Sequence, residues 1–378
     1  MSASKTIKML SRLLCTALLL GPAVAFADYE LNLAPGVTEI SQMQYDLHML
    51  VLWICTIAGI GVFSVMIYSI IKHRKSKGAQ AAQFHESTTV EVIWTVVPFV
   101  ILVAIAVPAT QGLLALEDSS NPDMNIKVTA IQWKWEYDYI DEKGVRFISQ
   151  LDNASEDARK LDSGKDVTKV ENYLLNVDKP MVVPVNKRVR ILLTSKDVIH
   201  AWWVPAVGVK RDAIPGFVNE SWFKATKVGT YRGQCAELCG KDHGFMPIVL
   251  KVVSDADYAS WVKEQQASAG ASAAEDTKTF TMDELMVRGK AVYDKSCAAC
   301  HGATGAGIPP MFPAMTGSKI ATGDKAGHID IVANGKTGTA MAAYKSQLSK
   351  AEIAAVITYE RNAFGNKTGD MVQPSDIK

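Results

Sequence analysis

The 378-residue sequence has almost no net charge, because 40 lysines and arginines balance 39 acidic residues. A net charge of +1 argues against nucleic-acid binding and gives no sign of a strongly acidic partner. Cysteine is scarce, with six residues, and there is no internal repeat. Two stretches of 25 residues, 47–71 and 92–116, lack Asp, Glu, Lys and Arg altogether. Apolar runs longer than about 20 residues predict membrane-spanning helices.

The charges around these runs predict their orientation. The segment between them, 72–77, is basic (KHRKSK), and basic loops stay on the cytoplasmic side of a membrane. Residues 28–120 are therefore expected to form a two-pass hairpin in a bacterial inner membrane, with the C-terminal part in the periplasm. Residues 1–27 have a basic start, a short apolar segment and the exit Ala25-Phe26-Ala27, which is typical of a cleaved secretory signal peptide.

Beyond the membrane the composition changes twice. Residues 121–264 contain short runs that alternate apolar and polar side chains between turn residues, which predicts an antiparallel β-sandwich or barrel. Residues 265–280 are rich in Ala, Ser and Gly and are expected to be a flexible linker. Residues 281–378 show helical patterns, one of which opens with Ser349 as a cap ahead of Glu352. They are expected to form a separate small all-α domain.

The sequence Cys297-Ala-Ala-Cys300-His301 is the attachment pattern of a c-type haem. Each thiol adds to a haem vinyl group, and the adjacent histidine becomes the proximal iron ligand. A redox disulfide is the alternative, but no thioredoxin-like βαβ pattern surrounds the motif.

The second axial haem ligand is expected to be a methionine. Met341 is preferred, because it precedes the last helix as the distal methionine does in small cytochromes c. Met311 and Met315 are the alternatives. They lie in a stretch that supports the proximal side in that family, where a proline carbonyl accepts the histidine ring N–H.

A second cluster of metal-binding side chains occupies residues 235–246 (CAELCGKDHGFM). A disulfide between Cys235 and Cys239 is one interpretation in an oxidising compartment, and zinc is another. Neither explains Met246, whose soft thioether favours copper. Two thiolates could bridge two copper ions, each with its own imidazole. His243 offers one and His200, at the end of a β run, offers the other.

Four segments together resemble subunit II of the haem–copper cytochrome c oxidases over about residues 40–262: TTVEVIWTVVP, QWKWEYDY, DVIHAWWVPAVGVKRDAIPG and GQCAELCGKDHGFMPIVL. The helical domain is similar to the class I cytochromes c that are fused to some bacterial subunits II. The resemblance implies a multidomain chain with a transmembrane hairpin, a cupredoxin-like Greek-key β-barrel and a small all-α cytochrome c domain.

The resemblance also implies cofactors and residue roles. In a binuclear CuA centre, Cys235 and Cys239 would bridge the coppers, His200 and His243 would be terminal ligands, and Met246 would be a weak one. Glu237 would give its backbone carbonyl to copper, and its carboxylate would help hold magnesium at the boundary with subunit I. Trp133 matches the aromatic residue where electrons enter, and Glu91 matches a glutamate at the cytoplasmic mouth of a proton path. A packed strand tryptophan and a solvated carboxylate are the alternatives for these two.

The expected function is electron transfer from haem c through CuA to subunit I, where oxygen is reduced to water with proton pumping. Expected partners are subunit I, a subunit III, a soluble or membrane-bound cytochrome c donor and membrane lipid, with no nucleic acid. A copper-delivery protein is an alternative, although the hairpin, Met246 and the haem motif count against it. A nitrous oxide reductase would need a propeller domain for which no residues remain, and a quinol oxidase subunit would lack the cysteines.

Overall fold

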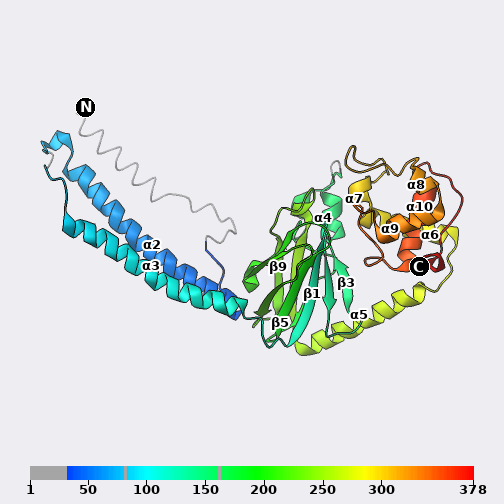
Figure 1. Ribbon diagram of the computed structural model, residues 1–378, viewed down its shortest axis with the longest axis horizontal. Helices are drawn as coiled ribbons and strands as arrows, with labels where there is room; N and C mark the ends of the chain where they lie inside the picture. The colour runs from blue at the N-terminus through cyan, green and yellow to red at the C-terminus, as the bar shows by residue number, and fades with distance from the viewer. Residues whose placement is uncertain (1–31, 81–82, 161–162) are drawn as a thin grey trace.

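The computed structural model describes residues 32–80, 83–160 and 163–378, so the predicted signal peptide at residues 1–27 lies outside the described part. A long helical hairpin, a β-sheet domain and a small helical domain follow one another along the chain (Figure 1). This order confirms the predicted fold class.

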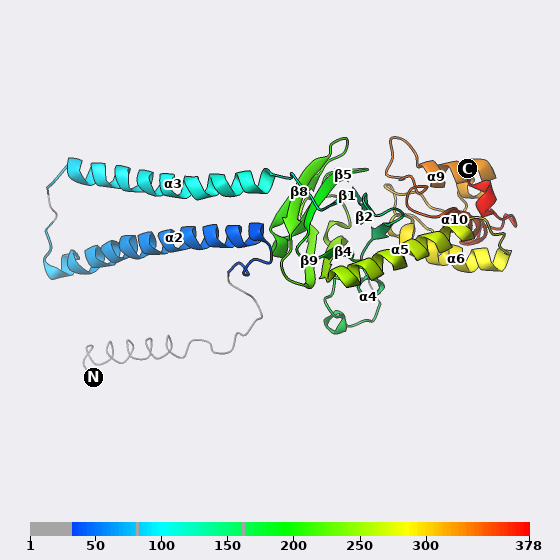
Figure 2. The same cartoon turned by 90° about the horizontal axis from the view of Figure 1, so that it is seen from below.

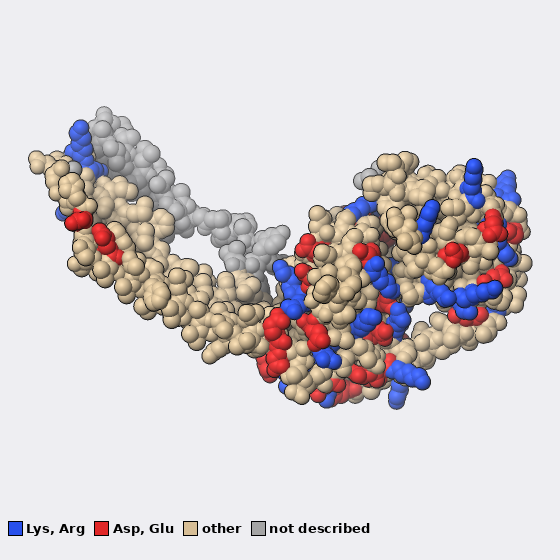
Figure 3. All heavy atoms as spheres, viewed as in Figure 1, with Lys and Arg blue, Asp and Glu red and all other residues tan. Residues whose placement is uncertain are grey.

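The hairpin consists of α2 (Glu39–Lys72) and α3 (Thr88–Glu117), both long and apolar enough to cross a membrane. The predicted spans, 47–71 and 92–116, lie inside these helices. Thr38 and Ser41 form a capping box that starts α2 at the barrel end. The hairpin surface is almost free of charge along its length, and basic side chains gather at the end that carries the α2–α3 turn (Figure 3).

Two five-stranded sheets enclose the core of the β-domain. The first has the order β3 (Arg146–Ser149), β2 (Lys134–Tyr139), β1 (Met124–Ile131), β5 (Arg188–Ser195) and β8 (Asn219–Lys224). The second has the order β4 (Met181–Pro184), β10 (Pro247–Val253), β9 (Gly229–Cys235), β6 (His200–Val204) and β7 (Val209–Ala213). Trp135, Tyr137 and Trp202 are fully buried between the sheets, so burial of large aromatic side chains stabilises the domain. A short helix, α4 (Asn153–Ala158), follows β3.

The prediction of a purely antiparallel domain is wrong for two strand pairs. β1 runs parallel to β5, and β4 runs parallel to β10. In the first pair 56 residues lie between the strands, from Ile131 to Arg188, and in the second pair 62 residues, from Pro184 to Pro247. Alternation within a single strand reports which face is buried, but it contains no information on which distant strand lies alongside.

The flexible linker expected at 265–280 is also wrong for most of its length, because α5 spans Asp255–Glu275. Ser254 caps the helix through the N–H of Asp257, and Trp261 packs on Tyr139 with ring centroids 5.1 Å apart. The helix therefore starts on the barrel and continues through the alanine-rich segment, since alanine has the highest helix propensity. At about 1.5 Å per residue, α5 is a rod of roughly 30 Å that leads to the C-terminal domain (Figure 2).

The C-terminal domain contains α6 (Met282–Ser296), α7 (Ala298–His301), α8 (Lys319–Thr322), α9 (Lys325–Asn334) and α10 (Lys350–Asn362). Helices α6 and α10 cross at Gly289, where a Cβ atom would lie only 2.1 Å from the carbonyl oxygen of Ala355. The predicted capping box of Ser349 and Glu352 starts α10. This packing presents α7, which carries the CxxCH motif, on the side of the domain that faces the barrel (Figure 1).

Candidate metal centre and haem site

Strand pairing brings the two halves of the predicted copper centre together. His200 is the first residue of β6 and Cys235 the last residue of β9, and these strands are paired where Trp202 lies opposite Cys235. The loop after β9 then carries the other side chains, namely Cys239, His243 and Met246. The N–H of Cys235 donates to the carbonyl of Met246 at 3.1 Å, which closes this loop on itself. Residues 35 positions apart thus share one buried site.

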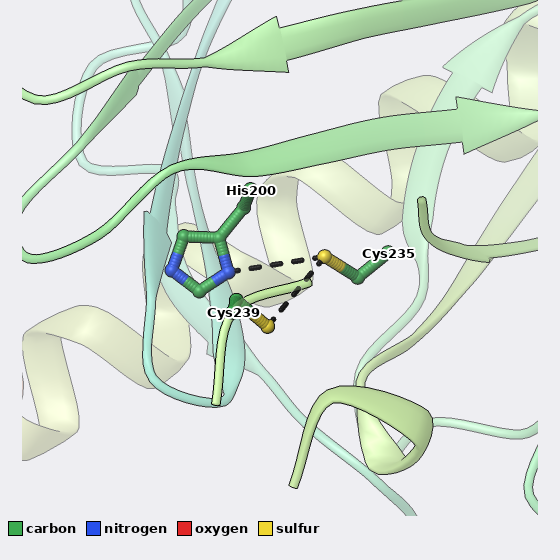
Figure 4. Close-up of side chains that lie close together, drawn as sticks. All are labelled: His200, Cys235 and Cys239. Carbon is green, nitrogen blue, oxygen red and sulfur yellow. Dashed lines mark hydrogen bonds between the residues drawn. The ribbon is translucent and has the colours of Figure 1, made fainter. Parts of the chain in front are cut away.

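The sulfur and nitrogen atoms face one another across short distances. The two Sγ atoms of Cys235 and Cys239 are 3.8 Å apart, and Nδ1 of His200 lies 3.8 Å from the Sγ of Cys235 (Figure 4). On the other side, Nδ1 of His243 lies 3.4 Å from the Sγ of Cys239. A disulfide needs about 2.05 Å between its sulfurs, so both thiols are free here. The arrangement is two thiols side by side, each with its own imidazole.

Two weaker donors complete the set. The backbone carbonyl of Glu237 lies 3.4 Å from the Sγ of Cys235, and Met246 is buried with 1% of its surface exposed. The side chain of Glu237 points outward and is exposed. These donors fit a pair of soft metal ions between the thiols, because thiolate, imidazole and thioether are the ligands that copper prefers. A single tetrahedral zinc would not use two imidazoles on opposite sides of a thiol pair together with a thioether.

Asp197 is a contact that the sequence analysis missed. Its Oδ1 accepts a hydrogen bond from Nε2 of His200 at 2.9 Å, and its Oδ2 accepts one from the N–H of Gln132 at 2.7 Å. Burial raises the pKa of Asp197, but these hydrogen bonds and one from the N–H of Val198 hold it below its ordinary value. The carboxylate fixes the tautomer of His200 and leaves Nδ1 free for a metal. The spacing D-x-x-H ahead of a metal-binding histidine is the sequence signal that could have revealed it.

The two thiols differ in their acidity. The hydrogen bond from Cys239 lowers the pKa of Cys235 well below its ordinary value, and the contact with His200 acts in the same direction against burial. The same neighbour and burial raise the pKa of Cys239 well above its ordinary value. Because metal binding requires both thiolates, it must release the remaining proton from this pair.

Trp133, the predicted point of electron entry, contacts the loop that carries Cys239, His243 and Met246, which is called the copper loop below. Its ring N–H donates to the carbonyl of Cys239 at 3.1 Å, and the side-chain amide of Gln132 donates to the same oxygen at 2.8 Å. Gly240 has a φ of +113° and would place a Cβ 3.2 Å from the Trp133 ring. The absence of a side chain at Gly240 therefore lets the indole lie against the loop.

The CxxCH motif presents two free thiols next to a histidine with a fixed ring orientation. Cys297 and Cys300 are free thiols on either end of the first turn of α7. Nδ1 of His301 donates to the carbonyl of Pro313 at 2.8 Å, which is the proline contact expected from the sequence. This bond leaves Nε2 as the nitrogen that can bind iron.

The three methionines occupy different environments. Met311 is 66% exposed, whereas Met315 and Met341 are partly buried and pack, like Cys297 and Tyr344, against the core of the helical domain. Met341 and one of the attachment cysteines therefore pack against the same apolar core. Its role as axial ligand stays a prediction, as does the proximal-side role of Met315.

Glu91 lies far from the copper centre along the chain's long dimension. It is exposed in the first turn of α3, at the end of the hairpin that carries the basic turn, while the other end of α3 joins the barrel (Figure 2). The structure therefore groups Glu91 with the basic turn and not with the candidate copper and haem residues.

Comparison with protein families matches three segments of the chain. Residues 124–253 match the family "Cytochrome C oxidase subunit II, periplasmic domain", and residues 27–111 match "Cytochrome C oxidase subunit II, transmembrane domain". Residues 284–359 match "Cytochrome C oxidase, cbb3-type, subunit III". These segments correspond to the barrel, the hairpin and the helical domain.

Individual proteins are similar to part of the chain. A probable cytochrome c oxidase subunit 2 from Rickettsia bellii is 38% identical over 234 residues, which cover 62% of this chain and 83% of the relative. The cytochrome c oxidase subunit 2 of Cereibacter sphaeroides is 36% identical over 61% of this chain and 78% of its own length. The crystal structure of the periplasmic domain of subunit II of cytochrome oxidase from Bradyrhizobium japonicum is 46% identical, covering 40% of this chain and 98% of that chain with a TM-score of 0.35.

Identity over most of a relative's length, together with family matches over both the hairpin and the barrel, decides the classification. The chain belongs to the cytochrome c oxidase subunit 2 family, and it carries a cytochrome c domain after the barrel.

Proposed function

We propose that this chain is subunit II of a respiratory oxidase and receives electrons at a haem bound covalently to Cys297 and Cys300. Electrons would then pass through a copper pair in the barrel to subunit I, where oxygen is reduced to water with proton pumping. The observation that carries the proposal is the pair of free thiols 3.8 Å apart, each with an imidazole nitrogen on its own side. The cytochrome c family match of the helical domain supports the haem.

The residues around the thiols would hold the coppers in a fixed arrangement. Cys235 and Cys239 would bridge both ions, and His200 and His243 would each bind one. Because His200 and Cys235 lie on paired strands, the sheet would hold these two ligands at a fixed separation. The remaining weak ligands would be Met246 and the carbonyl of Glu237.

The haem-binding residues would act in the same way in the helical domain. His301 would bind the iron from one side, held by its bond to Pro313, and Met341 would bind it from the other. Trp133 would be the entry point for electrons into the barrel, since its ring touches the backbone of Cys239.

The hairpin would place the two domains in the periplasm of a bacterium with an inner membrane, with the basic turn in the cytoplasm and residues 1–27 removed as a signal peptide. We further assign residues 28–120 to the membrane anchor, 121–264 to the copper domain and 281–378 to the cytochrome domain. Subunit I, a subunit III and a cytochrome c donor are the proposed partners. The exposed carboxylate of Glu237 would help to hold magnesium at the contact with subunit I, and Glu91 would lie at the mouth of a proton path.

A copper-delivery protein would also bind copper through two cysteines and a histidine. Membership of the oxidase family and the fused cytochrome domain argue against that role.

The proposal is tested by replacing each thiol in the full-length chain. Cys235→Ser and Cys239→Ser should abolish the two-copper EPR signal and electron transfer to the oxidase, while the covalent haem stays. Cys55→Ser is the matched control, because Cys55 is an exposed thiol of α2 outside the site. A full copper content in either site variant would overturn the assignment.

A further inference from the structure

Three lysines of the barrel contact the cytochrome domain. Lys241 Nζ donates to the carbonyl of Ala299 at 3.1 Å, and Lys196 Nζ donates to the hydroxyl of Ser346 at 2.9 Å. The third cation, Lys134, lies with its Nζ 5.2 Å from the centroid of the Tyr344 ring. An ion pair between Lys295 and Asp178, 2.8 Å long, joins the domains nearby. Three lysines of the barrel thus reach the cytochrome domain, and Lys295 of the cytochrome domain reaches the barrel.

The contact joins the loops that carry the two sets of redox ligands. On the cytochrome side, Ala299 lies between the two haem cysteines, and Tyr344 follows Met341 by three residues. On the barrel side, Lys241 lies between Cys239 and His243, and Lys134 follows Trp133 directly. Helix α7 faces the barrel at this contact (Figure 1). The haem-attachment edge of one domain thus meets the copper loop of the other.

Lys134 is unusual among these cations because it is buried without an acidic partner. Only 8% of its surface is exposed. Lys196 pairs with Glu136 at 2.7 Å, whereas no carboxylate in the described part of the chain forms an ion pair with Lys134. Burial lowers the pKa of Lys134 to about 8, although the nearby Cys297 sulfur opposes this change. A buried cation costs free energy that an apolar side chain of the same length would not, so packing alone does not explain a lysine here.

We propose that the positive charge of Lys134 acts across the domain contact on the haem. It raises the one-electron reduction potential of the haem and so favours the reduced form. The proposal rests on the proposed function, since it requires a haem at Cys297 and Cys300. Thioether bonds to these cysteines would hold one edge of the ring at the loop that Lys241 contacts through Ala299, and Lys134 lies in the same domain contact, over the Tyr344 ring. Reduction adds one electron and neither forms nor breaks a bond. A positive charge at that edge therefore stabilises the product.

The test is a spectroelectrochemical titration of the haem in the full-length holoprotein. In Lys134→Met the ratio of oxidised to reduced haem at a fixed applied potential should rise on the order of tenfold. This rise is equivalent to a reduction potential that is lower by about 59 mV for a one-electron couple. Lys134→Arg keeps the charge and should keep the potential. Lys127→Met removes an exposed lysine of β1 and is the matched control. An unchanged or higher potential in Lys134→Met would overturn the proposal.

A pH series gives a second readout that a structural role would not move. As pH rises through about 8, Lys134 loses its proton, so the haem potential of the wild type should fall while that of Lys134→Met stays level. The other groups that face Lys134 are Lys196, Lys295 and Tyr344, which both proteins share, and the two cysteines, which no longer titrate once they are thioethers. Parallel pH curves would contradict the proposal. A chain that holds neither haem nor copper would instead contradict the proposed function.

Discussion

The contact between Asp197 and His200 makes a prediction about copper affinity. Asp197→Asn keeps the size of the side chain but removes the charge that orients the imidazole through its 2.9 Å bond to Nε2. Replacing the hydrogen-bond partner of a metal-binding histidine typically lowers metal affinity 10–100-fold, which corresponds to about 1.4–2.7 kcal/mol. We therefore expect copper affinity to fall by about that factor, with a changed EPR spectrum and an unchanged haem spectrum.

The affinity is measured by competing the detergent-solubilised full-length chain against a copper chelator of known strength. Asp138→Asn is the control, because this partly buried carboxyl lies on β2 and has no contact with the copper residues. Thermal unfolding of the copper-free proteins separates a loss of affinity from a loss of fold. Wild-type affinity in a folded Asp197→Asn variant would refute the orienting role of Asp197.

Three further predictions concern other parts of the chain. Met341→Leu should keep the covalent haem but give the visible spectrum of an iron with a missing axial ligand. Met311→Leu, at a 66% exposed position, should keep the wild-type spectrum, and a wild-type spectrum in Met341→Leu as well would show that Met341 is not the ligand. Glu91→Gln should slow steady-state turnover and leave haem-to-copper transfer in a single turnover unchanged; normal turnover would make Glu91 a solvated helix-end carboxylate. Gly289→Ala should destabilise the cytochrome domain by about 1–3 kcal/mol, because its Cβ would lie 2.1 Å from the carbonyl of Ala355. The control is Gly270→Ala, at an open position of α5, which should not lower the melting temperature. If Gly289→Ala melted at the same temperature as Gly270→Ala, the close packing of α6 on α10 would be contradicted.

Most of the proposed copper ligands could be grouped from the sequence because they are local. Cys235, Cys239, His243 and Met246 lie within twelve residues, and ligands so closely spaced must share a site. His200 was predicted from its place at the end of a β run. The contact between Asp197 and His200 has a local signal in the D-x-x-H spacing, but the bond of Asp197 to the backbone of Gln132 could not be predicted, because it depends on the parallel pairing of β1 with β5.

The interface between the domains could not be predicted from the alternation of apolar and polar residues along the strands. In β2, the first four residues are all buried, although the strand alternates in character. Trp135 and Tyr137 point into the barrel core, while Lys134 lies under the cytochrome domain. Alternation reports one buried face, and here a second domain buries the other.

The tether was mispredicted for a related reason. Composition alone made residues 265–280 a flexible coil, but alanine and serine also continue a helix that has already started. The helix is started by the Ser254 cap and by the packing of Trp261 on the barrel. Both residues lie outside the linker segment, so its composition does not reveal them.

The central claim is that one chain carries a copper pair and a covalent haem. The most direct measurement is metal analysis combined with EPR of the purified full-length protein. The account predicts two coppers and one covalent haem per chain, with an unpaired electron shared by two copper nuclei at the thiols of Cys235 and Cys239. A single copper with hyperfine structure from one nucleus, or zinc at these thiols, would contradict it.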